Sequence, residues 1–399
     1  MRARTLLAVA VLAAAAPASA NAATPPSRVP SAQAAIVVDA RDGTVMFAKR
    51  PDAERAIAST TKLMTALLTL EEAKPSEVFT APAYTAAPAE SRINLREGER
   101  MSVEDLLEAL VLESANDAAV ALAENISGSR DAFVDEMNDR AEELGLDHTS
   151  YANPIGLDEP GNYSSAHDLA TLASLLLRKP RFARIVDMPR ATLESGSHPR
   201  VVANRNDLVA AYPWVDGVKT GYTLNAGNVL VGAAEGGRRA RVVSVVLGEP
   251  SEAARDQDTL TLLRWGLDRF SRVRVLAPGR ALARADVKYR DDTARLVPRR
   301  SIVLTVRDGQ RVRRQVNAPD ELEGPVAAGE RVGSVTVLVD GRPVRRVALV
   351  TASDVPGAGT PRVLLSVLGV PLTLLIGVGI LVAAILAMLR VRVRIRIAR

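Results

Sequence analysis

The 399-residue chain contains no cysteine, only three histidines, and few aromatic residues (3%). Without cysteine it forms no disulfide bonds and offers neither thiol chemistry nor cysteine ligands for a metal. The histidines His148, His167 and His198 lie far apart in the sequence, which argues against a histidine-based metal centre. The sequence therefore predicts no metal and no other cofactor.

Charge is ordinary in amount, at 24% of residues, with a formal net charge of +5. Five arginines fall within the last ten residues, 390–399. Because this tail carries much of the positive excess, we expect no basic surface on the folded part and no nucleic-acid partner.

Residues 1–22 have the pattern of a cleaved signal peptide. Arg2 and Arg4 precede an apolar run at 6–16, and small residues at 18–20 suit a signal peptidase. A second cleavage site lies at 20–22, and a retained amino-terminal anchor is the alternative. We expect cleavage, because the run is short and alanine-rich, and a flexible leader at residues 23–33.

The carboxyl-terminal end predicts a membrane anchor. Residues 363–389 are 27 residues without a charge, long enough to span a bilayer as a transmembrane helix that tolerates Pro371. The arginines of the tail, 390–399, favour its location in the cytoplasm. A Pro- and Gly-rich linker at 354–362 precedes the helix, so we expect a single-pass protein with its bulk on the extracellular or periplasmic side of the cell membrane.

Residues 34–272 predict one α+β domain with an antiparallel sheet flanked by helices. A hairpin comes first, then a block of helices, then three strands and a closing helix, while residues 201–213 look irregular. The expected strands are 35–40, 44–49, 214–221, 228–234 and 241–248, and the expected helices are 55–72, 102–112, 118–126, 131–144, 166–177 and 252–270.

Residues 273–353 have a different texture and predict a small all-β domain. Short alternating runs separated by Gly-containing turns are expected as strands at 301–306, 311–316, 331–339 and 343–350. This segment contains no cluster of residues suited to catalysis.

Ser59 and Lys62 lie near the beginning of the predicted helix 55–72. They are three residues apart and therefore on the same face. The helix is apolar on nearly all sides, through residues such as Leu63, Met64 and Leu67. Desolvation in such surroundings lowers the pKa of a lysine, and a neutral amine is able to take the proton of a serine hydroxyl.

Two more motifs follow in the chain. Ser114-Ala115-Asn116 falls on the break between two helices, and Lys219-Thr220-Gly221 ends a strand, where Gly221 allows another segment to approach. A Ser-x-x-Lys, a Ser-x-Asn and a Lys-Thr-Gly in this order are typical of penicillin-binding proteins and class A β-lactamases.

With these motifs the sequence resembles the D-alanyl-D-alanine carboxypeptidase family, the low-molecular-mass penicillin-binding proteins. The resemblance covers residues 34–353 and includes Asn153-Pro154-x-Gly156-Leu157, the segment 215–223 and Leu263-x-Trp265-Gly266. Residues 301–351 resemble the second domain of the family. The resemblance implies a peptidase of peptidoglycan biosynthesis, with peptidoglycan stem peptides as substrates and β-lactam antibiotics as covalent inhibitors.

The resemblance also implies the role of each residue in the covalent step. Ser59 is the nucleophile that attacks the carbonyl between two D-alanines, and Lys62 accepts its proton. Ser114 and Lys219 relay a proton to the departing D-alanine, and water then cleaves the acyl-enzyme.

Substrate binding falls, by the same resemblance, to a second set of residues. Asn116 holds the substrate amide, and the backbone N–H groups of Ser59 and Tyr222 form the oxyanion hole. Thr220, helped by Arg255, binds the terminal carboxylate.

One departure and two alternatives remain. The middle motif is Ser-Ala-Asn instead of Ser-Asp-Asn, and the deacylating glutamate of class A β-lactamases has only a weak candidate, Glu159. A β-lactamase is one alternative, which the anchor and the β domain argue against. A catalytically silent wall-binding protein is the other, and it would have no need of Lys62.

Overall fold

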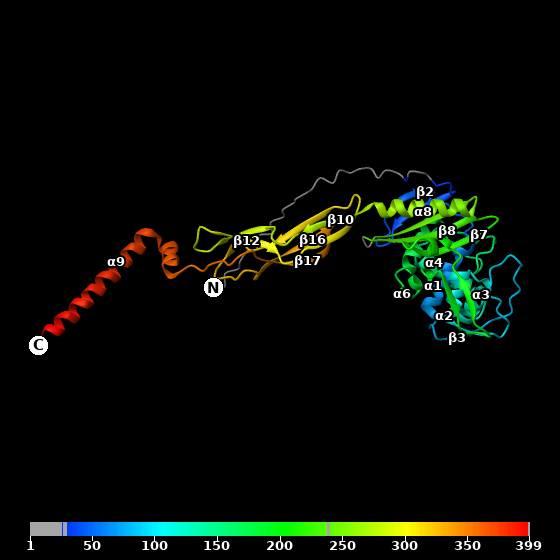
Figure 1. Ribbon diagram of the computed structural model, residues 1–399, viewed down its shortest axis with the longest axis horizontal. Helices are drawn as coiled ribbons and strands as arrows, with labels where there is room; N and C mark the ends of the chain where they lie inside the picture. Colours follow the sequence, from blue (N-terminus) through cyan, green and yellow to red (C-terminus); the bar gives the residue numbers. More distant parts are fainter. Residues whose placement is uncertain (1–25, 27–29, 238–239, 398–399) are drawn as a thin grey trace. The chain divides into compact units, whose positions relative to one another are not determined.

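The computed structural model describes residues 26, 30–237 and 240–397 of the chain (Figure 1). The predicted signal peptide, residues 1–22, lies outside the described residues, as does most of the predicted leader. The described chain divides into two compact units between Ser271 and Arg272.

The first unit is built on a five-stranded antiparallel sheet. Its order is β2 (Val45–Lys49), β1 (Ala34–Asp39), β9 (Ala240–Glu249), β8 (Gly227–Gly236) and β7 (Val215–Thr223). The predicted hairpin and the three later strands are thus confirmed, and strands from both ends of the unit meet in one sheet. All six residues of β1 are buried, because the sheet is covered on both faces.

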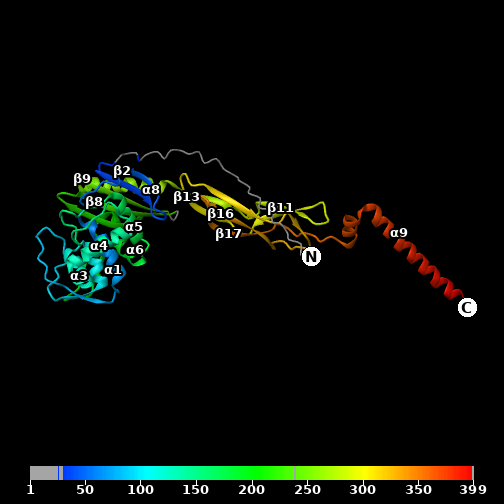
Figure 2. The same ribbon diagram turned by 180° about the vertical axis from the view of Figure 1, so that it is seen from behind.

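Each face of the sheet has its own apolar core. Ile36 and Val38 of β1 point into the larger core with the helices α1 (Lys62–Glu72), α3 (Asn116–Ser127) and α5 (Ala166–Leu176). Ala35 and Val37, which alternate with them, pack with α8 (Glu252–Asp268) through Leu262, Leu263 and Trp265. Figures 1 and 2 show α8 on one side of the sheet and the other long helices opposite. The predicted α+β class is confirmed.

The remaining elements of this unit are short, apart from α4. They are β3 (Val78–Thr80), β4 (Arg100–Ser102), α2 (Val103–Glu108), α4 (Arg130–Glu143), α6 (Pro180–Val186), β5 (Arg190–Leu193), β6 (Arg200–Ala203) and α7 (Asp207–Ala211). Residues 201–213, expected to be irregular, contain part of β6 and all of α7. Val201 and Val202 pair with β5, and the Asn206 side chain caps α7 by accepting from Leu208 N.

Two helix predictions are wrong at their ends. The segment expected as a helix from residue 55 is not helical before the 3₁₀ turn η1 (Ala58–Thr61), and α1 begins only at Lys62. Ala58 has a φ of 48°, which a continuous helix does not allow. In the segment expected as a helix over 102–112, the α-helical hydrogen bonding stops at Glu108. A π-helical turn, η2 (Ala109–Glu113), follows directly.

The second unit contains the predicted all-β domain. A six-stranded sheet has the order β14 (Val312–Asn317), β16 (Arg331–Val339), β17 (Arg342–Thr351), β12 (Thr293–Pro298), β11 (Ala283–Val287) and β15 (Glu321–Leu322). A separate pair joins β10 (Phe270–Leu276) to β13 (Ile302–Arg307). The four expected strands are present, and β10, β11, β12 and β15 were not expected.

Positive charge is not confined to the tail. Residues 272–353 contain 16 arginines and one lysine against nine acidic residues. Residues 272–353 therefore carry a basic excess of their own.

The chain ends in α9 (Thr360–Ile397), which Gly369 interrupts with a non-helical φ of 74°. Pro371 lies just after this break, in the first turn of the continuing helix. A backbone N–H at this position would have no acceptor within the helix, so proline costs no hydrogen bond there. Among the described residues, one helix, Pro371–Leu389, is long and apolar enough to cross a membrane. The uninterrupted apolar helix is thus shorter than the expected span of 363–389.

Candidate active site

Two glycines shape the backbone around Ser59. A Cβ on Gly221 of β7 would lie 2.9 Å from Ser59 N, and a Cβ on Gly156 would overlap the carbonyl oxygen of Ala58. Gly156 also has a φ of 88°, a conformation that favours glycine. The turn η1 is therefore held between β7 and the loop at 153–157.

Lys62 is buried, with 1% of its surface exposed, at the first position of α1. Its Nζ lies 3.0 Å from Ser59 Oγ, 2.6 Å from Asn116 Oδ1 and 2.5 Å from the carbonyl oxygen of Ile155. Burial lowers the pKa of Lys62 well below its usual value, and the nearby charge of Lys219 lowers it further. Both effects favour the neutral amine.

Ser114 lies at the end of the π-helical turn η2, in the left-handed conformation with a φ of 62°. The residue is 5% exposed, and its Oγ has no hydrogen-bond partner among the described residues. A buried hydroxyl without a partner is uncommon in folded proteins, so Ser114 is available to a bound ligand. Ala115 and Asn116 then open α3, and Asn116 reaches Lys62.

Lys219 and Thr220 are buried on β7, directly before Gly221. Lys219 Nζ donates to the carbonyl oxygen of Thr220 at 3.2 Å. Burial lowers the pKa of Lys219 to about 7; the charges of Arg205 and Arg255 act in the same direction, and that of Glu113 opposes them.

The last two predicted site residues, Tyr222 and Arg255, differ in burial. Tyr222 is 59% exposed, so its side chain projects from the end of β7. Arg255 lies in the first turn of α8, and its side chain is 6% exposed. Its Nε donates to Asp256 Oδ1 at 2.8 Å, and its Nη1 lies 3.9 Å from Glu252 Oε1. Its acidic neighbours match an ordinary ion pair, yet its burial and its effect on Lys219 associate it with the site.

Glu159, the weak candidate for a deacylating carboxylate, is exposed. Its Oε2 accepts from Asn153 Nδ2 at 2.9 Å. Asn153 Oδ1 in turn accepts from the N–H groups of Ile155 and Gly156, at 3.3 and 2.7 Å. Glu159 thus belongs to the hydrogen-bonded loop that carries the Ile155 carbonyl to Lys62.

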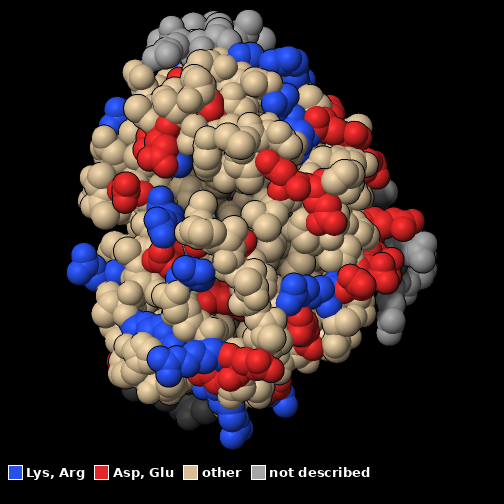
Figure 3. Space-filling view, turned by 90° about the vertical axis from the view of Figure 1, so that its right-hand side faces the viewer, with Lys and Arg blue, Asp and Glu red and all other residues tan. Residues whose placement is uncertain are grey.

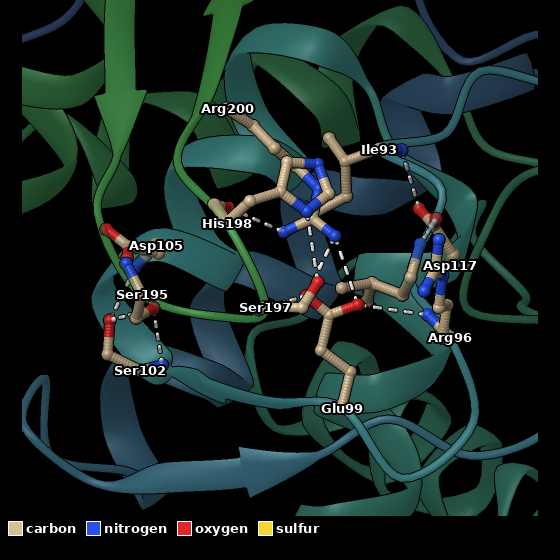
Figure 4. Close-up of polar contacts among 11 residues, drawn as sticks. Ile93, Arg96, Glu99, Ser102, Asp105, Asp117, Ser195, Ser197, His198 and Arg200 are labelled. Carbon is tan, nitrogen blue, oxygen red and sulfur yellow. Dashed lines mark hydrogen bonds and ion pairs between the residues drawn. The ribbon is translucent and has the colours of Figure 1, made fainter.

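Sequence reasoning missed Glu90 and Asp117. Glu90 Oε2 accepts from Asn116 Nδ2 at 2.6 Å. Asp117 accepts from the backbone N–H groups of Ile93, at 3.1 Å (Figure 4), and Leu95, at 2.9 Å. Asp117 directly follows Asn116 of the second motif, and this position was a signal from which its place near the site could have been predicted. Glu90 lies in an irregular stretch with no local signal.

A second polar network, also drawn in Figure 4, supports one side of the site. Glu99 and Arg200 form a buried ion pair at 2.8 Å, and Glu99 also accepts from Ser197 N at 2.7 Å. This pair ties the β5–β6 hairpin to the segment before α2. The hairpin leads to Arg205, whose N–H donates to the carbonyl oxygen of Leu112 and whose guanidinium pairs with Glu113, next to Ser114.

Figure 3 shows a face on which Lys and Arg side chains alternate with Asp and Glu side chains. No field of one sign covers this face.

A serine hydroxyl 3.0 Å from a buried lysine amine, beside a helix-flanked antiparallel sheet, is an arrangement typical of serine acyl-transfer enzymes. Comparison with family sequence models agrees. The family described as D-alanyl-D-alanine carboxypeptidase matches residues 19–251, and the penicillin-binding protein 5 C-terminal domain matches residues 270–357. The chain belongs to the D-alanyl-D-alanine carboxypeptidase family and is a serine peptidase.

Individual relatives support the same assignment over most of the chain. D-alanyl-D-alanine carboxypeptidase DacF of Bacillus subtilis is 31% identical over 338 residues, which are 82% of this chain and 87% of the relative. The structure of penicillin-binding protein 5 from Haemophilus influenzae is similar with a TM-score of 0.60 and 31% identity, covering 84% of this chain and 99% of that one. The Streptomyces K15 DD-transpeptidase has a TM-score of 0.58 and 29% identity, covering 60% and 98%.

Proposed function

We propose that this chain is a serine D-Ala-D-Ala carboxypeptidase that removes the terminal D-alanine from peptidoglycan stem pentapeptides. The observation that carries the proposal is the contact of Lys62 Nζ with Ser59 Oγ at 3.0 Å inside a buried site. The family and its relatives, which are named for this activity, support it.

In the covalent step, Ser59 Oγ attacks the carbonyl carbon of the penultimate D-alanine. The hydroxyl proton passes to Lys62 Nζ, whose lowered pKa keeps a lone pair available. The C–N bond to the terminal D-alanine then breaks. Its nitrogen takes a proton through the hydroxyl of Ser114, the proton held on Lys62 restores the relay of Ser114 and Lys219, and D-alanine leaves as the free amino acid while Lys62 is neutral again.

Hydrolysis of the acyl-enzyme restores Ser59. Water adds to the ester carbonyl, the C–Oγ bond breaks, and the shortened peptide leaves as a carboxylic acid while Ser59 regains its proton. The N–H groups of Ser59 and Tyr222 stabilise the oxyanion in both halves. Gly221 makes this arrangement possible because a side chain there would collide with Ser59 N.

The substrate is held by groups around this centre. Asn116 binds the amide of the stem peptide, and Thr220 binds the terminal carboxylate. Arg255 adds positive charge near Lys219, which favours a free carboxylate at that position.

β-Lactams acylate Ser59 by the same attack and give a long-lived adduct. The exposed position of Glu159, bonded to Asn153, argues against its use as a deacylating base and therefore against a β-lactamase. A silent wall-binding protein is also disfavoured, because burial of Lys62 and Lys219 is costly and unexplained without catalysis.

We assign residues 34–272 to the catalytic domain and 273–353 to the small β domain. We further propose a cleaved signal at 1–22, a leader at 23–33, a linker at 354–362, and one membrane crossing within 363–389. The arginine tail at 390–399 would lie in the cytoplasm and the catalytic domain outside. Truncation at Thr360 should release active protein to the medium or periplasm, and recovery of that form in the membrane fraction would contradict this topology.

The proposed activity is tested with a synthetic peptide ending in D-Ala-D-Ala and an assay for free D-alanine. The wild type should release D-alanine, pretreatment with penicillin should abolish the release, and Lys62→Met should lose at least about 10³-fold in rate. Rapid turnover of penicillin without D-alanine release would favour the β-lactamase, and no reaction with either would favour the silent binder.

A further inference from the structure

The amine of Lys62 has two neighbours that only accept hydrogen bonds. They are Asn116 Oδ1, at 2.6 Å, and the carbonyl oxygen of Ile155, at 2.5 Å. A neutral lysine has two N–H groups and one lone pair. When both N–H groups point to these two oxygens, the lone pair is left for the hydroxyl of Ser59, 3.0 Å away.

This arrangement depends on which way the Asn116 amide is turned. If the amide were flipped, Nδ2 would donate to the lone pair of Lys62, and the base would no longer face Ser59. A group on the far side of Asn116 that only accepts hydrogen bonds would prevent the flip, because it requires Nδ2 on its own side.

Glu90 is such a group. Its Oε2 accepts from Asn116 Nδ2 at 2.6 Å, and its Oε1 accepts from Ala87 N at 2.8 Å. The hydroxyl of Tyr84 donates a hydrogen bond to the same Oε2. Burial opposes ionisation of Glu90, but these hydrogen bonds lower its pKa, so the carboxylate is ionised at neutral pH.

The loop that carries Glu90 is itself fixed. Asn116 N donates to the carbonyl oxygen of Ser91 at 2.8 Å, so the main chain next to Glu90 is bonded to the start of α3. The Tyr84 ring lies under the guanidinium of Arg130, 5.4 Å from its centroid, and Arg130 pairs with Glu124 at 2.7 Å. Burial raises the pKa of Tyr84, which keeps it a donor.

We propose that Glu90 is a positioning residue for acylation: it fixes the amide of Asn116 and thereby directs the lone pair of Lys62 at Ser59. The proposal rests on the proposed function and adds to it a residue outside the three motifs.

Glu90 also has an electrostatic effect on the base. The charged groups that act on Lys62 are Lys219, which lowers its pKa, and Glu90 and Asp117, which raise it. Glutamine in place of Glu90 keeps an oxygen that accepts from Asn116 when its NH2 group faces Ala87 N, whose hydrogen bond is then lost, and it removes one negative charge. The pKa of Lys62 should then fall, and the neutral base should persist to lower pH.

The experiment measures the second-order rate of acylation of the full chain by a fluorescent penicillin between pH 5 and 10. Glu90→Ala should lower the plateau rate at least tenfold. Glu90→Gln should stay within about threefold of the wild-type plateau, with the acid limb of its profile shifted to lower pH. Glu97→Gln, an exposed acid of the same stretch, should match the wild type in both.

Each outcome of this experiment bears either on the role of Glu90 or on the proposed function. A wild-type plateau and profile for Glu90→Ala would overturn the proposal. If Glu90→Ala does not fold, Glu90→Gln decides: an acid limb at the wild-type pH would show that the Glu90 carboxylate does not act on Lys62 and would also overturn the proposal. A wild type that is not acylated at all would instead contradict the proposed function.

Discussion

The backbone of Gly221 lies against that of Ser59, so closely that a Cβ on Gly221 would be 2.9 Å from Ser59 N and 3.0 Å from Ala58 Cβ. Gly221→Ala must therefore move β7 or the turn that carries Ser59. We expect at least a tenfold loss in the rate of penicillin acylation, because small displacements of reacting groups are costly, and a loss of about 1–3 kcal/mol in stability from overpacking.

The matched control for this substitution is Gly236→Ala on β8. A Cβ there meets only the side chain of Leu267, at 3.2 Å, which is able to shift. Acylation kinetics and denaturant unfolding of both variants give the comparison. Equal acylation rates for Gly221→Ala and the wild type would show that the close approach has no catalytic role.

Lys219 should make activity and stability depend on pH in opposite directions. Its pKa is about 7 in the folded protein, against an ordinary value of 10.5, so its ammonium form declines as the pH rises through 7. If that form serves the leaving group and the carboxylate, kcat/KM for the peptide should fall above pH 7. Between pH 7 and 10.5 the unfolded chain binds more protons at this site, so the contribution of Lys219 to stability becomes more favourable as the pH rises.

Lys219→Met tests both statements. The variant should lose activity yet gain about 1–3 kcal/mol of stability at pH 7, and the gain should shrink toward pH 10.5. Unfolding at pH 7 and pH 10 measures the difference, with the exposed Lys74→Met as the control. A loss of stability at pH 7 would mean that burial of this lysine is compensated in the folded state.

Arg255 should distinguish peptides with a free carboxyl terminus from peptides with a blocked one. Arg255→Ala should reduce kcat/KM on a free D-Ala-D-Ala peptide by about 1.5–3 kcal/mol, the contribution of a charged hydrogen bond. An amidated peptide should lose much less. Equal losses on both peptides would return Arg255 to a purely structural role with Asp256 and Glu252.

Glu99 should stabilise the catalytic unit at neutral pH and lose this effect in acid. Burial disfavours its ionisation, but hydrogen bonds from Ser197, Arg200 and Arg96 outweigh burial and lower its pKa from 4.5 to about 2. Its stabilisation is therefore complete above pH 4.5 and is lost as the pH falls toward 2. Glu99→Gln should cost about 1–3 kcal/mol at pH 7, because Arg200 is left buried without its partner, and should approach the wild type near pH 2.

Urea unfolding between pH 2 and 7 measures this difference, and Glu97→Gln provides the exposed control. A difference between Glu99→Gln and the wild type that does not change with pH would show that the charge of Glu99 is not what stabilises the hairpin.

Local patterns in the sequence were sufficient for the sheet and the motifs. Alternating or continuous apolar runs predicted the five strands of the catalytic unit, and the motifs that contain Ser59, Asn116 and Lys219 fall next to one another in the structure. The strands and each single motif depend on residues close together in the chain, which is why they were predictable. That the three motifs form one site was implied by the family resemblance and not by local pattern.

The errors arise where distant segments determine the conformation. The 3₁₀ turn at Ser59 exists because Gly156 and Gly221, about 100 and 160 residues away, close around it. The π-helical turn before Ser114 has no signature in the periodicity. Glu90 lies in a loop without regular structure, and only the fold shows that it reaches Asn116.

The central claim, that Ser59 is the nucleophile, is tested most directly by mass spectrometry of the protein after incubation with penicillin. The account predicts one added penicilloyl group, located on the peptide that contains Ser59, with the adduct absent from Ser59→Ala and persisting for many minutes in the wild type. An adduct on another residue, or the same labelling of Ser59→Ala, would contradict it.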